Sequence, residues 1–177
     1  SDIVQFLVEC YHSLYPNYEF NWTEMITTLA KSDAPKEAIQ NLVSVQQEFF
    51  SNQSIDWSTI LDNAVGQSQE ISHETFASLV ECSISKRMKA IGVKYWRDEL
   101  TNIKYTEPVV MFRDVREQRR RAFRAEVEAK LAQYETEYHN LKEATTILEL
   151  ALWKNKMRDF GNQGGKQCKV DESSVRE

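Results

Sequence analysis

The densest group of residues able to do chemistry is a run of arginines. Arg113, Arg116, Arg120 and Arg124 are three or four residues apart, so on a helix they would share one face. Guanidinium groups bind phosphates or carboxylates through paired hydrogen bonds. However, acidic residues are interleaved with the arginines and the sequence pI is about 5.4, which argues against a general nucleic-acid binder. We expect this face to be solvated or to dock on an acidic part of the chain, with a nucleic-acid-binding adaptor as the alternative.

The other chemically active residue types form no catalytic or metal-binding pattern. His12, His73 and His139 are far apart, and only Cys10 lies at metal-ligand spacing from a histidine. Structural zinc usually takes four ligands, so this pair is weak support for a metal site. There is no glycine-rich phosphate loop, nucleophile elbow or His-Glu-x-x-His element. We therefore predict a protein without enzymatic activity, metal or cofactor.

Cysteine usage and hydropathy bear on the compartment. Cys10, Cys82 and Cys168 are an odd number without close spacing, which does not suit a disulfide framework and fits a reducing environment. The sequence shows no secretory signal and no apolar run approaching 18 residues. We expect an intracellular protein, cytoplasmic or nuclear, with no membrane span.

Charge divides the chain into two parts. Residues 1–80 hold 11 acidic and 2 basic side chains, a net charge of −9, whereas residues 81–177 hold 16 acidic and 20 basic, a net charge of +4. Such a division can steer partners toward the molecule or let its two parts attract each other.

A repeat of about 35 residues organises the acidic part. Leu7-Val8 returns as Leu42-Val43 and as Leu79-Val80, and Trp22 returns as Trp57. A period in the thirties is typical of stacked helix pairs, because one pair cannot bury its apolar face alone. Five Gly and three Pro in 177 residues also favour helices over sandwiches or barrels, which need frequent turns.

The repeat resembles a degenerate ankyrin repeat over residues 3–84. Residues 21–30 fit the short inner helix of that family, and residues 3–8 and 35–43 fit its outer helix. The Thr-Pro-Leu-His element and the turn glycine of the family are missing. The resemblance therefore implies the helix pairs, and with them a role in binding other proteins, rather than the family's hairpin loops.

A second resemblance lies toward the C-terminus. Residues 141–154, with 85–87 and 92–98 before them, are similar to segments in leucine-rich-repeat and ankyrin-like proteins of single-celled algae. That group has no established activity to carry over.

The basic part contains a heptad pattern. After Pro108 no Gly or Pro occurs until Gly161, which predicts one long helix or two with a small break. Within it, apolar or small residues alternate by three and four, the spacing of a coiled-coil seam. Packing on a helix of the same chain and homodimerisation through residues 127–152 both fit. The seam consists of Leu131, Tyr134, Tyr138, Leu141, Thr145, Leu148 and Leu152.

These observations predict an all-α protein in four segments. Ankyrin-like helix pairs span 1–84, a connecting helix 85–106, a long coiled-coil-like helix or helical hairpin 107–160, and a disordered tail 161–177. We expect a non-catalytic interaction or scaffold module, or a subunit of a larger assembly. Besides the arginine face, the candidate partner-binding residues are Trp96 and Trp153, each flanked by Lys or Arg. Either tryptophan could instead be buried as part of a hydrophobic core.

Overall fold

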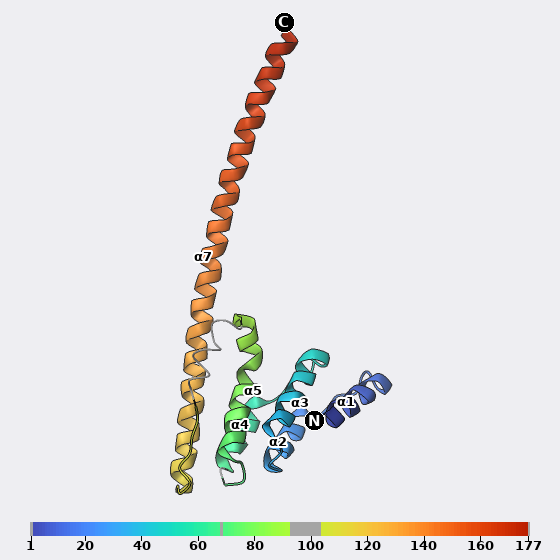
Figure 1. The fold of residues 1–177 in the computed structure, drawn as a ribbon, viewed down its shortest axis with the longest axis vertical. Coiled ribbons are helices and arrows are strands. Elements are labelled where there is room, and N and C mark those ends of the chain that lie inside the picture. Colours follow the sequence, from blue (N-terminus) through green and yellow to red (C-terminus); the bar gives the residue numbers. More distant parts are fainter. Residues whose placement is uncertain (1, 68, 93–103, 177) are drawn as a thin grey trace. The chain divides into compact units, whose positions relative to one another are not determined.

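All regular secondary structure in the described part of the chain is α-helical. A computed structural model describes the backbone of residues 2–67, 69–92 and 104–176, and within these ranges the side chains of residues 3 and 5–162. The chain forms two compact units, residues 1–132 and 133–177. Figure 1 shows the helices, which are α1 (Asp2–Leu14), α2 (Trp22–Lys31), α3 (Lys36–Phe49), α4 (Trp57–Gly66), α5 (His73–Ile91) and α7 (Arg113–Arg176).

Helices α2 and α4 begin in the same way, 35 residues apart. The side chain of Asn21 accepts a hydrogen bond from the backbone N–H of Glu24, and that of Asp56 accepts one from Thr59. Both helices have ten residues, and both capping residues have nearly the same backbone angles. Such caps satisfy an N–H group that the helix itself leaves unpaired. The sequence repeat is therefore also a repeat of helix starts.

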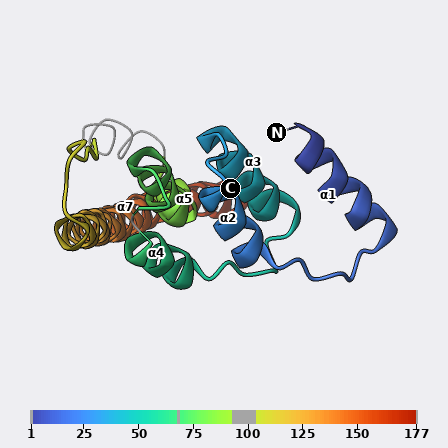
Figure 2. The same ribbon diagram turned by 90° about the horizontal axis from the view of Figure 1, so that it is seen from below.

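The helices of the first unit stack in a row, as Figure 2 shows. Helix α3 lies between α1 and α5, while α2 packs on α3 and on α4, and α4 packs on α5. Trp22 is fully buried, whereas Trp57 is only half-buried. The two tryptophans thus occupy equivalent sequence positions but different environments.

The core lies between the stacked helices. Leu42 and Leu79 are buried, and so is the Cys82 thiol, whose pKa burial raises to about 12. A thiol with such a pKa is protonated at neutral pH and unreactive. The core is completed mainly by Val8, Ile26, Ile39, Val43, Phe50, Ile60, Leu61, Phe76, Val80 and Met88.

The predicted connecting helix, residues 85–106, is described only at its two ends. Residues 85–91 are the last part of α5, which ends where Gly92 adopts a φ of 101°, a conformation that favours glycine. Residues 104–112 are not helical, and residues 93–103, including Trp96, lie outside the described residues.

The long helix is displaced at both ends from the predicted 107–160. It begins at Arg113, after a non-helical segment that contains Pro108. The assigned helix continues to Arg176, and the disordered tail expected over residues 161–177 stays a prediction. Gly161, Gly164 and Gly165 each disfavour a helix by only about 1 kcal/mol relative to alanine, whereas a proline would break it.

Candidate protein-interaction surface

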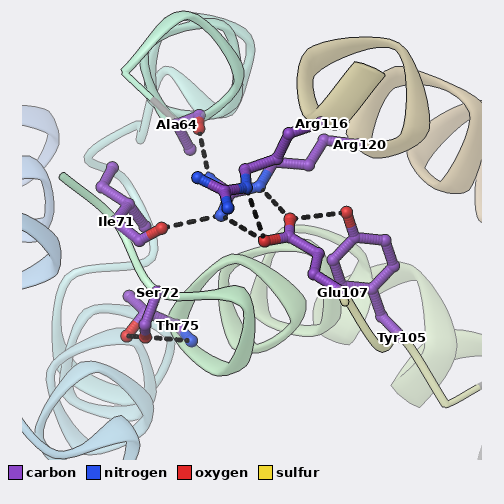
Figure 3. A network of polar contacts seen from close by, with 8 residues as sticks. All are labelled: Ala64, Ile71, Ser72, Thr75, Tyr105, Glu107, Arg116 and Arg120. Atoms are coloured by element: carbon purple, nitrogen blue, oxygen red, sulfur yellow. Dashed lines mark hydrogen bonds and ion pairs between the residues drawn. The ribbon is translucent and has the colours of Figure 1, made fainter. Parts of the chain in front are cut away.

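The first turns of α7 carry a buried guanidinium group. Arg120 is 1% exposed and donates hydrogen bonds to the carbonyl oxygens of Ala64 (2.9 Å) and Ile71 (2.7 Å). It also forms a paired interaction with the carboxylate of Glu107, as Figure 3 shows. The guanidinium carbon lies 5.1 Å from the centre of the Phe76 ring. Arg120 therefore joins α7 to α4, to the start of α5 and to the segment before α7.

Glu107 is the shared acceptor of this network. Its carboxylate accepts a hydrogen bond from the Tyr105 hydroxyl (2.7 Å) and lies 3.3 Å from Nε of Arg116. Burial by itself would raise the pKa of Glu107, but the hydrogen bonds from Arg120 and Tyr105 and the two arginine charges lower it overall. Burial raises the pKa of Tyr105, as does its bond to Glu107. The site is thus a carboxylate held ionised by two guanidinium groups.

The outer arginines of the predicted face also meet acceptors of their own unit. Arg113 donates to the carbonyl oxygen of Gly66 (3.0 Å) and pairs with Glu117, and Arg124 pairs with Asp62 of α4 at 2.7 Å. All four arginines named from the sequence therefore have partners within residues 1–132. Arg113 is nevertheless exposed, as are Arg119 and Arg121.

The predicted seam divides into a buried and an exposed part. Leu131 is fully buried and Val127 and Tyr134 nearly so. From Tyr138 onward every seam residue is exposed, including Thr145, whose hydroxyl donates to the backbone oxygen of Leu141. We call the exposed part the first strip: Tyr138, Leu141, Thr145, Leu148 and Leu152.

A second apolar strip lies on another side of the same helix. Leu150, Trp153, Met157 and Phe160 are spaced by three, four and three residues, and Ile147 precedes them by one turn. All five are at least 53% exposed. We call them the second strip. It contains Trp153, which the sequence singled out as a partner-binding candidate.

Helix α1 has an exposed apolar face as well. Leu7 is 59% exposed, although its repeat equivalents Leu42 and Leu79 are buried, and Ile3, Phe6 and Leu14 are also exposed. In the second and third copies of the repeat this leucine is covered by neighbouring helices. The first copy leaves it open.

The described residues contain no group of three or more His, Cys, Asp or Glu side chains placed to hold a metal ion. Within the same part of the chain, no helix combines the length and apolar character needed to cross a membrane.

Two features of the surface were missed from the sequence. Glu107 is a single acid before a proline, and nothing in its neighbourhood marks it as the acceptor of Arg120. The second strip, however, had a readable signal, because positions 150, 153, 157 and 160 follow the same three-and-four spacing as the seam.

No protein-family model, curated protein or solved structure matches the chain.

Proposed function

We propose that this chain is a non-catalytic protein–protein interaction module, and that residues 138–160 of α7 bind α-helices of other protein chains. The observation that carries the proposal is the exposure of both apolar strips. Leu148, Leu152, Trp153 and Phe160 are each more than half exposed, although large apolar side chains are usually buried. A helix that is apolar on more than one side is typically covered by neighbours.

The chemistry of the strips favours a protein partner over a membrane or a nucleic acid. A helix that lies in a membrane surface has one apolar face and one strongly polar face, whereas this segment has two apolar strips. Its charges are mixed, with four basic and three acidic side chains in residues 138–160. Nucleic-acid binding requires a basic surface, and the four aligned arginines instead meet acceptors of the first unit.

With two strips, one chain could bind two helices at once, which suits a scaffold or a subunit of an assembly. Helical partners commonly insert apolar side chains at three-and-four spacing into the grooves of the helix they bind. Aromatic residues often supply much of the binding energy in such interfaces, which makes Trp153 the anchor of the second strip.

Site-specific photo-crosslinking tests this proposal in the cell that makes the protein. A photoreactive amino acid would replace Leu148 or Trp153, with Asn140, a polar residue outside both strips, as the matched control. We expect protein adducts from the two strip positions and none from the control. Adducts that nuclease removes, or no adducts at all, would reject the proposal.

A further inference from the structure

We infer that the first strip pairs with the first strip of a second copy of this chain, antiparallel, with its centre between residues 146 and 147. This inference rests on the proposed function and names one partner for it. The second copy is favoured over an unrelated helix because the charges beside the strip complement those of an identical chain. They do so in one orientation and one register.

The layers of such a pair can be read from the strip. Around the proposed centre, Leu141 lies opposite Leu152 of the second copy, and Thr145 lies opposite Leu148. Each of these layers occurs twice by symmetry. The next layer places Tyr138 opposite Asn155 of the second copy, a pairing of hydroxyl and amide. Polar layers of this kind can fix the register of a coiled coil.

The flanking charges agree with this register. Lys142 follows Leu141 on one side of the strip and would face Glu149 of the second copy, while Glu137 on the other side would face Arg158. All four side chains are exposed. Because each pair occurs twice, the arrangement contains four attractive pairs between residues 137 and 158 and no repulsive one.

Other arrangements are less complementary. Shifting the antiparallel pair by one heptad places Lys142 opposite Lys142, or Glu149 opposite Glu149, of the second copy. A parallel pair in register brings Glu137 near Lys142, but its other flanking pairs over this stretch involve Ala144 and Ala151. It therefore has two attractive pairs where the antiparallel pair has four. Like charges at these positions are a known means of excluding registers.

The buried part of the seam restricts the pairing further. Val127 and Leu131 are covered within the first unit, so a pair that extended over residues 127–137 would have to expose them. The proposed register uses only residues from 137 onward. Residues 159–176 of the second copy would otherwise run alongside residues 117–134, where the seam is covered, so the pair requires the end of each chain to turn away after about residue 158.

Charge reversal in the full chain tests the orientation. We expect K142E and E149K each to raise the dissociation constant of the dimer about tenfold, since each places two like-charged pairs at the interface. The double variant K142E/E149K should return to within about threefold of the original value. In a parallel pair, E149K would change little and the double variant would stay as weak as K142E.

Cysteine crosslinking gives an independent readout of the same register. In a chain with Cys10, Cys82 and Cys168 replaced by alanine, T145C alone should not form a disulfide-linked dimer. A mixture of differently tagged T145C and L148C chains should form one between the two tags. Disulfide formation by T145C alone would show a parallel pair and overturn the inference.

The mass of the wild-type chain, from light scattering coupled to size exclusion, separates this inference from the proposed function. We expect two chains per particle. A monomer at all concentrations would overturn the inference. If the photo-crosslinks at Leu148 then contained only other proteins, the interaction function would stand without self-pairing, whereas absence of adducts would remove both.

Discussion

Between Arg113 and Ala132, helix α7 buries a guanidinium group, whereas between Tyr138 and Phe160 it leaves leucines, a methionine and a tryptophan exposed. Both parts reverse the usual distribution, in which charges face water and large apolar groups do not. In the first part the reversal is compensated within the chain, because Arg120 finds a carboxylate and two carbonyl oxygens. In the second part the described chain supplies no cover for the two strips, so we look to another chain for it.

The comparison shows that one continuous helix can attach to its own chain in one part and offer a binding surface in another. The first turns of α7 attach it to α4 and α5. Its later turns expose apolar side chains that would be more stable against another helix than in water. The predictions below test whether the two tasks are separate, beginning with the largest expected effect.

Replacing Arg120 by alanine should lower the free energy of unfolding of the first unit by about 3–5 kcal/mol, because it leaves the buried Glu107 carboxylate with a single, more distant arginine. Chemical denaturation followed by circular dichroism measures this loss. The matched control is R121A, an exposed position that should stay within about 0.5 kcal/mol of wild type. Equal losses in both variants would show that Arg120 does not fasten α7.

Truncating one leucine in each part of the seam should separate the two tasks. L131A should destabilise the first unit by about 2–5 kcal/mol, since Leu131 is fully buried and its truncation leaves a cavity. L148A should change this stability by less than about 0.5 kcal/mol, because Leu148 is 64% exposed. Its effect should appear as a lower particle mass at a given concentration. A large stability loss in L148A with unchanged mass would contradict the division.

Acid should weaken the fastening of α7. The pKa of Glu107 is lowered in the folded chain, so the stability it contributes is complete above the ordinary glutamate pKa of about 4.3 and is lost as the pH falls through that value toward the folded pKa. Unfolding free energies of wild type and E107Q, measured from pH 7 to pH 3, should therefore converge at low pH. A difference that stays constant down to pH 3 would assign the effect of E107Q to packing instead.

Local signals in the sequence predicted most of the helices. Asn21 and Asp56 mark helix starts by their capping side chains, and the alternation of apolar residues sets the buried faces. The boundaries of α7 were harder to predict. Pro108 lies five residues before its first residue, and the glycines from 161 onward do not end it. The ankyrin-like resemblance remains a prediction, although α2 and α4 begin 35 residues apart.

The arginine face could be read from the sequence, but its acceptors could not. Helical spacing places Arg113, Arg116, Arg120 and Arg124 together, yet two of the acceptors of Arg120 are backbone carbonyl oxygens of Ala64 and Ile71, which no residue type reveals. Tertiary packing alone brings them there. For the same reason the sequence could not show which part of the seam is buried. Leu131 and Leu148 are the same residue type and differ only in their surroundings.

Hydrogen exchange measured by mass spectrometry most directly tests the central claim that α7 has a fastening part and an associating part. It would be applied to the wild-type chain and to a variant with L141D and L148D. The account predicts that residues 138–160 are protected in wild type and exchange much faster in the variant, while residues 113–132 are equally protected in both. Fast exchange of residues 138–160 in wild type, or loss of protection in both parts together, would contradict it.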